Sequence, residues 1–366
     1  MEDLSRYGIP NDDWKRFVAT NPLPDFPSDL KLLDIQGKVN AEREAAAKKE
    51  FNDSGLGFQV SYQHKQVHMR DNIINNIRVF RPGSISDGDK DNIQLPVYVF
   101  YHGGGFFFGS ERQNDYDCAR LAIDHRMIIV NANYRHTPTW TYPTQHNDAW
   151  DVFDWVMKNI DSLKGDRSRV IIGGVSAGAN LAAHVVRQHL QLQRAKKGKE
   201  SPDVNLVGLV MDCPWLLHPY SYPPDRRSLN HQSYVQCADA PLLPMKRLNF
   251  FARHLGPVPN DLSSFMHPNL FTEDLEALPP TVVMVAGNDP FRDEGWVFAT
   301  NLTNAGVPVN KYIFPGMPHG FWRFEALRAA SLYRVALNTS FRQLLGVDQS
   351  PPKREFQVMG YIGDFQ

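Results

Sequence analysis

The chain has 366 residues, of which 42% are hydrophobic and 22% are charged, so its composition excludes wholesale disorder and a fibrous repeat. Its 39 basic and 40 acidic residues give a formal net charge of -1, which provides no overall field to attract nucleic acid. The three cysteines, Cys118, Cys213 and Cys237, are an odd number without a Cys-x-x-Cys pair, which argues against a disulfide framework and a cysteine zinc site.

The chain begins with the polar residues 1–7, and no apolar leader follows them. No later run approaches the ~18 apolar residues of a membrane span. We therefore expect a cytoplasmic protein with no membrane span. Residues 1–55 are expected to form helix and loop, because residues 40–51 are rich in the helix formers Ala, Glu and Lys. We interpret this N-terminal helical segment as a contribution to a cap.

The pattern then predicts strands, followed by strands that alternate with helices. Strands are expected at 58–62, 77–80, 96–101, 127–132, 169–173, 206–211, 281–285 and 310–314, and helices at 148–159, 177–190 and 326–345. Strands that alternate with helices favour an α/β fold with a mostly parallel sheet and helices on both faces. We expect roughly eight strands in that sheet.

The predicted elements also set domain limits. Residues 56–212 and 276–346 are interpreted as the two parts of one α/β core. The roughly seventy residues between them are more than a normal connection needs, so residues 213–275 are interpreted as a cap insertion. Residues 347–366 have no clear periodicity and are expected to be a loosely held tail.

Two glycine-rich motifs follow predicted strands. Gly174-Val175-Ser176-Ala177-Gly178 lies between a strand and a helix, the setting of a nucleophile elbow, in which glycines permit a sharp turn that exposes the serine hydroxyl. A tight turn with an idle serine is the structural alternative. The run His102-Gly103-Gly104-Gly105 follows another strand and could bring bare backbone N–H groups close to a substrate oxygen. A flexible glycine loop is the alternative there.

A serine nucleophile needs a base and an acid. His319 lies late in the chain, in a loop that opens after the last predicted strand of the core. Asp289 follows the preceding strand, at the carboxyl end where sites form in open α/β sheets. The order Ser176, Asp289, His319 is the order of a triad on an α/β-hydrolase fold.

From about residue 96 to residue 345 the chain resembles the hormone-sensitive-lipase-like branch of the α/β-hydrolases. The matching residues are His102-Gly103-Gly104-Gly105-Phe106 with Gly109, Tyr134-Arg135, Asp148, Ser176-Ala177-Gly178, Asn180-Leu181, Asp289-Pro290 with Asp293-Glu294, and His319-Gly320-Phe321. The resemblance implies an α/β-hydrolase fold with a helical cap made from the N-terminal segment and the insertion. It also implies a Ser176, Asp289 and His319 triad, and an oxyanion hole formed by the backbone N–H groups of Gly104, Gly105 and Ala177.

Three positions depart from the commoner family pattern. Val175 replaces an acidic residue, Ala179 replaces a glycine, and residues 137–139 read Thr-Pro-Thr instead of Ala-Pro-Glu. None of these changes affects the triad. Phe106 and Trp215 are candidates to line an apolar substrate pocket, although aromatic residues are core material first.

The resemblance implies a serine hydrolase that cleaves a small-molecule carboxylic ester, with no cofactor and no metal. Two alternatives stay open. The same scaffold also carries amide hydrolases and biosynthetic enzymes that hydrolyse or eliminate. It carries catalytically silent ligand-binding proteins as well, such as the plant gibberellin receptors, against which the presence of His319 argues. The sequence indicates neither the oligomeric state nor the acyl-chain preference.

Overall fold

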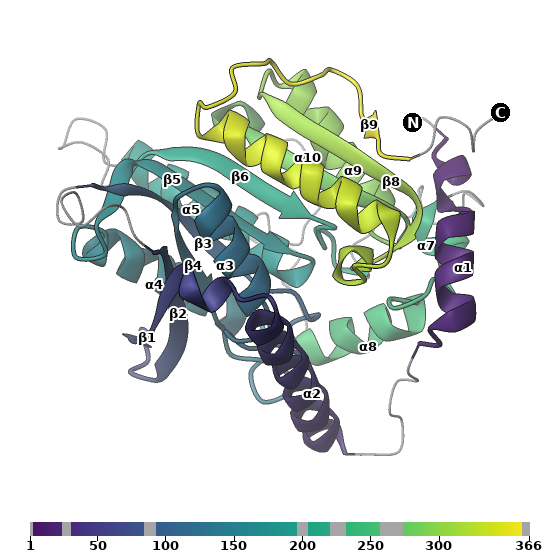
Figure 1. Ribbon diagram of the computed structural model, residues 1–366, viewed down its shortest axis with the longest axis horizontal. Coiled ribbons are helices and arrows are strands. Elements are labelled where there is room, and N and C mark those ends of the chain that lie inside the picture. The colour runs from purple at the N-terminus through teal and green to yellow at the C-terminus, as the bar shows by residue number, and fades with distance from the viewer. Residues whose placement is uncertain are drawn as a thin grey trace. The chain divides into compact units, whose positions relative to one another are not determined.

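The computed structural model describes residues 3–23, 31–83, 93–195, 204–219, 232–256 and 274–360. The chain divides into two compact units, named here by their position in the sequence. The central unit comprises residues 29–210, and the terminal unit comprises residues 1–28 and 211–366. Figure 1 labels the helices and strands of both units.

In the central unit the strands follow the order β1-β2-β4-β3-β5-β6. They are β1 Val60–His68, β2 Ile74–Pro82, β3 Leu95–Tyr101, β4 Ile128–Ala132, β5 Gly165–Val175 and β6 Leu206–Asp212, the last two residues of which belong to the terminal unit. β2 is antiparallel to β1 and β4, whereas β3 is parallel to β4 and β5. Every residue of β3 is buried, as expected for a strand that is covered on both faces.

Four helices and a short 3-10 turn complete the described part of the central unit. They are α2 Leu32–Asp53, η2 Leu56–Phe58, α3 Asp115–Asp124, α4 Thr144–Asn159 and α5 Ala177–Ala195. α3 packs against β2 and β4, α5 packs against β3 and β5, and α4 packs against α5. The apolar faces of these helices thereby cover strands that are themselves apolar.

In the terminal unit three parallel strands follow the order β7-β8-β9. They are β7 Thr281–Asn288, β8 Val309–Pro318 and β9 Gln357–Val358. The helices are η1 Ser5–Gly8, α1 Asp12–Thr20, α7 Ser233–Gln236, α8 Met245–Leu255, η5 Leu275–Ala277, α9 Arg292–Asn304, η6 Phe321–Arg323 and α10 Arg328–Leu344. β7 and β8 are buried along their whole length, with α9 packed against both strands and α10 packed against β8 (Figure 1).

The structure confirms the α/β class, the mostly parallel pairing and the alternation of strands and helices. The described residues form nine strands where about eight were expected, because the tail supplies β9. The Phe356 ring next to β9 stacks on Trp296 with centroids 3.6 Å apart, so this part of the tail is held by pairing and packing.

The expected domain limits stay predictions. Residues 220–231 and 257–273 of the expected cap insertion and residues 361–366 of the tail lie outside the described residues. No helix in the described part of the chain is long and apolar enough to cross a membrane.

Candidate active site

Ser176 lies on the turn between β5 and α5. Its φ of +57° places a residue with a side chain in the left-handed region, which costs on the order of 1–3 kcal/mol and is found most often at functional sites. The flanking glycines are required by close backbone contacts. A Cβ on Gly174 would lie 2.4 Å from the carbonyl of Gly178, and one on Gly178 would lie 2.0 Å from the carbonyl oxygen of Tyr101. The expected nucleophile elbow is therefore present as a backbone conformation.

The glycine loop after β3 lies against this elbow. A Cβ on Gly103 would lie 3.0 Å from the Val175 carbonyl oxygen and 3.4 Å from the Cβ of Ser176. Gly104 has a φ of +139°, and a Cβ there would lie 2.0 Å from the Phe108 carbonyl oxygen. Gly105 has a φ of +64°. The close contact thus excludes a side chain at Gly104, and the left-handed φ of Gly105 favours glycine there.

Three backbone N–H groups of the central unit are candidates to bind an oxyanion. Within the described residues, the N–H groups of Gly104 and Gly105 donate to no backbone carbonyl. Ala177 opens α5, where the first N–H groups have no partner within the helix. The dipole of α5 also favours negative charge at this end. These are the three donors that the resemblance implies.

Buried polar groups support the glycine loop. The Tyr134 hydroxyl donates to the His102 carbonyl oxygen at 2.9 Å, and the two rings stack with centroids 4.5 Å apart. The Nε2 of His102 lies 3.1 Å from the Oδ1 of Asn133. Burial lowers the pKa of His102. A neutral imidazole is therefore part of the loop support, which gives His102 a structural role.

The matched pair Arg135 and Asp148 has a structural role as well. The guanidinium of Arg135 donates to both carboxylate oxygens of Asp148, from Nε at 2.9 Å and from Nη2 at 2.6 Å. The hydrogen bond to Asp148 is the main cause that raises the pKa of Arg135. Such a bidentate pair fixes the chain direction after β4.

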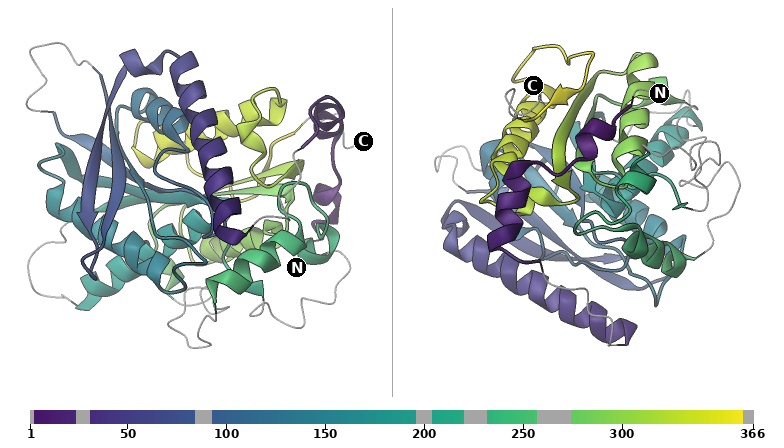
Figure 2. Two further views of the ribbon diagram at one scale, coloured as in Figure 1. Left: turned by 90° about the horizontal axis from the view of Figure 1, so that it is seen from below. Right: turned by 90° about the vertical axis from the view of Figure 1, so that its right-hand side faces the viewer.

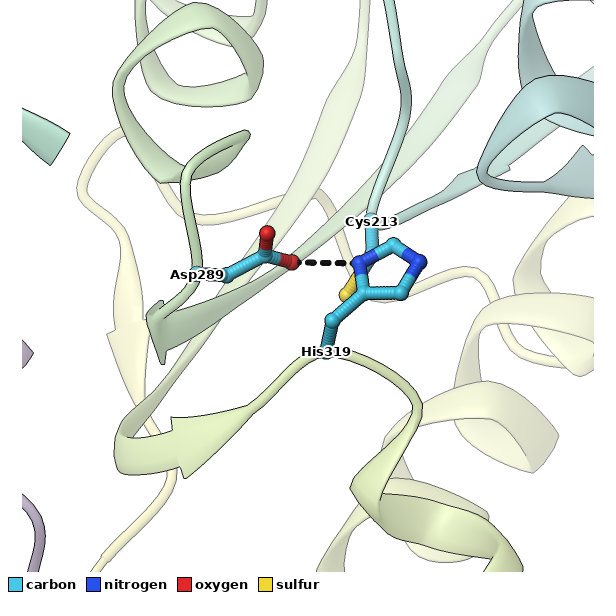
Figure 3. Close-up of side chains that lie close together, drawn as sticks. All are labelled: Cys213, Asp289 and His319. Carbon is cyan, nitrogen blue, oxygen red and sulfur yellow. Dashed lines mark hydrogen bonds and ion pairs between the residues drawn. The ribbon is translucent and has the colours of Figure 1, made fainter. Parts of the chain in front are cut away.

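In the terminal unit, His319 and Asp289 lie together. The Nδ1 of His319 is 2.7 Å from the Oδ2 of Asp289, and Figure 3 shows this bond as a dashed line. A carboxylate has only lone pairs to offer, so Nδ1 carries the proton and donates it. In the neutral ring Nε2 is then left with a lone pair that can accept a proton. Asp289 is 1% exposed, and its Oδ1 accepts the Phe291 N–H at 3.0 Å, so its orientation is fixed.

Acidic residues of the first turn of α9 tie other parts of the terminal unit to this region. Glu294 is buried and accepts the Leu216 N–H at 2.6 Å and the Tyr234 hydroxyl at 3.2 Å. Burial raises its pKa well above the usual range. Asp293 accepts the Ser233 N–H at 2.8 Å. The matched acidic residues therefore hold neighbouring segments in place beside Asp289.

Cys213 is a neighbour of this pair that the sequence did not single out. Its thiol belongs to a group of three possible metal ligands, with Asp289 and His319, whose ligand atoms all lie within 4.8 Å of one another (Figure 3). Sulfur, nitrogen and oxygen donors of this kind suit zinc. However, a metal would need the thiolate and a bare Nδ1. Burial raises the pKa of the Cys213 thiol well above its usual value, and Nδ1 and the carboxylate already satisfy one another. The arrangement favours an acid–base pair over a metal centre.

Both pocket candidates are fully buried. Phe106 has a φ of +58°, and its ring lies 5.7 Å from that of His146. Trp215 stacks on Phe291 with centroids 5.7 Å apart, and Phe291 in turn meets the His319 ring edge-on at 5.4 Å. Trp215 is therefore linked to His319 through Phe291, whereas Phe106 follows the proposed oxyanion donor Gly105 directly in the chain. A pocket-lining role for either residue stays a prediction.

A family model for the alpha/beta hydrolase fold matches residues 98–323, and the chain belongs to this family. This finding confirms the resemblance drawn from the motifs. The chain is 33% identical over 258 residues to carboxylesterase NlhH of Mycobacterium tuberculosis, a match that covers 70% of this chain and 73% of the relative. The chain is thus a member of a carboxylesterase-like hydrolase family.

Solved structures show the same fold. A bacterial heroin esterase is 27% identical, has a TM-score of 0.71, and matches over 93% of this chain and 99% of its own. The crystal structure of vibralactone cyclase has a TM-score of 0.80 over 93% of this chain and 96% of its own, at 24% sequence identity. At that identity the likeness to the cyclase shows the fold alone.

Proposed function

We propose that this chain is a carboxylesterase that hydrolyses small-molecule carboxylic esters through a covalent acyl-enzyme. Ser176 is the nucleophile, His319 the general base and Asp289 the residue that orients the base. The observation that carries the proposal is the partly buried Asp289–His319 hydrogen bond of 2.7 Å, in a chain that also holds Ser176 in the left-handed conformation of an elbow turn. The carboxylesterase relatives support the choice of ester over other acyl substrates.

In the first half of the reaction, the Oγ of Ser176 attacks the ester carbonyl carbon while the Nε2 of His319 takes the hydroxyl proton. Asp289 keeps the proton on Nδ1 and stabilises the imidazolium that forms. The tetrahedral intermediate then collapses, and its C–O bond to the alcohol breaks. The imidazolium gives its proton to the departing alcohol, which leaves the acyl group on Ser176.

In the second half, His319 removes a proton from water, which attacks the acyl-enzyme. As the bond between the acyl carbon and Ser176 breaks, the imidazolium returns this proton to the Oγ of Ser176, and the carboxylic acid is released. In both halves the negative charge develops on the former carbonyl oxygen. The N–H groups of Gly104, Gly105 and Ala177 supply the proposed oxyanion hole. Removing one such donor in other enzymes costs roughly 10²- to 10³-fold in rate.

The test is hydrolysis of para-nitrophenyl esters with acyl chains from two to twelve carbons, by the wild type and by Ser176→Ala. We expect kcat/KM to fall by roughly 10³-fold or more in the variant. A fluorophosphonate probe should label the wild type and not Ser176→Ala. The exposed Ser331→Ala variant, in which another hydroxyl is lost, should keep both labelling and turnover. Circular dichroism checks that each variant is folded.

Two results would contradict the proposal. Turnover that persists in a folded Ser176→Ala variant would replace the acyl-enzyme with another reaction on the same scaffold, such as an elimination. A folded wild type that neither hydrolyses the esters nor reacts with the probe would favour ligand binding without turnover.

The chain-length optimum of ester hydrolysis indicates the size of the acyl pocket. We expect the optimum to lie beyond the acetyl esters, because the expected cap insertion is rich in aromatic residues, which suit an apolar acyl pocket.

A further inference from the structure

The N-terminal segment of the terminal unit lies directly on the loops that carry Asp289 and His319. We name residues 5–20, which comprise η1, residues 9–11 and α1, the strap. η1 contacts β7, β8 and α7. The right-hand view of Figure 2 shows the strap in purple, running across the yellow-green strand β8. Apolar side chains anchor it, since Tyr7 and Trp14 are buried, as is Leu4 directly before it.

Asn11 connects the strap to the strand that leads to His319. Its Oδ1 accepts the Trp14 N–H at 2.9 Å and caps the start of α1. Its Nδ2 donates to the Pro315 carbonyl oxygen, also at 2.9 Å. One side chain therefore both begins a helix and binds the backbone four residues before His319.

Two glycines leave no space between the strap and the catalytic loops. Gly316 has a φ of +70°, and a Cβ there would lie 2.4 Å from the Asn11 nitrogen and 2.6 Å from the Ile9 carbonyl oxygen. A Cβ on Gly287 would lie 2.0 Å from the Tyr7 carbonyl oxygen. These glycines lie three residues before His319 and two residues before Asp289. The backbone of the strap thus contacts the backbone of both loops close to the two side chains.

A buried arginine also links the Asp289 loop to the strap, through Gln236. Arg292 is 0% exposed, and its Nη1 donates to the Gly287 carbonyl oxygen at 3.1 Å and to the Oε1 of Gln236 at 2.6 Å. Gln236 in turn donates from Nε2 to the Ser5 carbonyl oxygen at 2.6 Å. The strap, α7 and the start of α9 therefore form one connected hydrogen-bonded support.

We infer that the strap positions the Asp289–His319 pair, and that Asn11, Gly287 and Gly316 are its positioning residues. The inference rests on the proposed function for its kinetic effect, because a displaced imidazole transfers protons less well. Displacements of about 1 Å can lower a rate by roughly 10²-fold without changing any reacting group. The hydrogen bond between the two side chains is a second consequence, and it can be measured without any substrate.

The test compares two glycines with the same φ. Gly316→Ala adds a methyl group against the strap. Gly346→Ala adds one at the same φ of +70°, where no heavy atom lies within 4 Å. The backbone cost of a left-handed alanine is therefore matched between the two variants. We expect kcat to fall by roughly 10²-fold in Gly316→Ala, with KM within about twofold, and both values to be unchanged in Gly346→Ala.

A second variant guards against misfolding of the first. Asn11→Asp keeps the oxygen that caps α1 and removes the amide that donates to Pro315, so it loosens the strap without a steric clash. For all variants the second measurement is the downfield proton NMR signal of His319 Nδ1–H, assigned by its loss in Asp289→Asn. We expect the signal to weaken or shift in Gly316→Ala and Asn11→Asp and to persist in Gly346→Ala.

The two measurements separate the outcomes. If folded Gly316→Ala and Asn11→Asp keep both the wild-type rate and the signal, the inference is wrong. It is also wrong if Gly346→Ala loses as much as Gly316→Ala, because the effect would then come from the glycine conformation. A wild type without ester turnover, whose signal nevertheless responds only to the strap variants, would overturn the proposed function and leave the strap inference standing.

Discussion

Two N-terminal helical segments support loops of the proposed active site, one in each unit, and they do so by different means. In the central unit, α2 uses side-chain amides. Gln36 donates from Nε2 to the carbonyl oxygens of Phe107 and Thr137, and the Oδ1 of Asn40 accepts the Gly109 N–H at 2.9 Å. In the terminal unit, the strap relies mainly on close backbone contact at Gly287 and Gly316.

This difference predicts how each support fails. A support made by side-chain amides is weakened by removing a side chain. A support made by close backbone contact, as at Gly287 and Gly316, is disrupted by adding one. The first kind leaves unpaired carbonyl groups, at a cost of about 1–3 kcal/mol for each buried group. The second kind forces backbone to move, because the atoms that a new Cβ would meet belong to the main chain. Matched substitutions in the two units can therefore test the comparison.

The largest effect is expected from Gly287→Ala. The added Cβ would lie 2.0 Å from the Tyr7 carbonyl oxygen, so either the strap or the Asp289 loop must shift. We expect a loss of about 3 kcal/mol in the free energy of unfolding and a roughly 10²-fold lower kcat. Urea unfolding and ester kinetics on the same preparations measure both quantities.

Gly37→Ala is the matched change on α2. Gly37 is exposed, and a Cβ there would meet nothing within 4 Å. Alanine in a helix interior should raise the free energy of unfolding by about 0.5–1 kcal/mol and leave kcat unchanged. If Gly287→Ala and Gly37→Ala lowered the free energy of unfolding and kcat equally, the close backbone contact of the strap would have no special importance.

The sequence predicts the parts of the site that follow strands, and the structure explains why it does not predict the supports. Ser176, Asp289 and His319 each lie in a loop directly after a strand, so the predicted strands, the local loop motifs and the chain order together indicate them. Cys213 follows a fourth strand, β6, and no local motif indicates that it lies beside His319. Asn11 has the sequence signature of an ordinary helix cap, and its second hydrogen bond, to Pro315, joins residues 304 positions apart.

Helix α9 shows a further limit of periodicity. Arg292, Asp293 and Glu294 open the helix and are all buried, so charged residues lie where an apolar face is expected. Their partners come from segments far away in the sequence, as the Glu294 contact with Leu216 shows. A pattern read along the chain contains no record of these partners. The helix was accordingly absent from the predicted elements.

The next prediction concerns the central unit, which we expect to lose stability in acid. The imidazole of His146 is buried behind the glycine loop, 5.7 Å from the Phe106 ring, with Nε2 2.9 Å from the Asn180 Oδ1. Burial lowers its pKa from 6.5 to about 4. Above pH 6.5 the ring is neutral in both states, and its contribution to stability is complete. Below pH 6.5 the unfolded chain binds a proton that the folded chain does not, so stability falls until the pH reaches about 4.

The gap between 6.5 and about 4 corresponds to roughly 3 kcal/mol for His146 if its folded environment persists throughout. Urea unfolding between pH 7.5 and pH 4.5 covers most of this range. In His146→Gln we expect a shallower decline, because an amide does not titrate. The exposed His68→Gln variant should decline like the wild type. A decline that is equally steep in all three proteins would assign the acid sensitivity to other groups.

Gln36→Ala is expected to have a smaller effect than Gly287→Ala, and it separates the two supports most directly. The change removes the donor to two partly buried carbonyl groups, so we expect a loss of about 1–2 kcal/mol in the free energy of unfolding. We expect kcat to fall by roughly tenfold, because the loop that carries the proposed oxyanion donors is less well held. The exposed Lys38→Ala on the same helix should stay within about 0.5 kcal/mol of the wild type.

The downfield proton of His319 should be unchanged in Gln36→Ala, since α2 supports the glycine loop and the strap supports the acid–base pair. If Gln36→Ala disturbed that proton as much as Gly316→Ala does, the two supports would act on one coupled structure, and the distinction between them would be wrong.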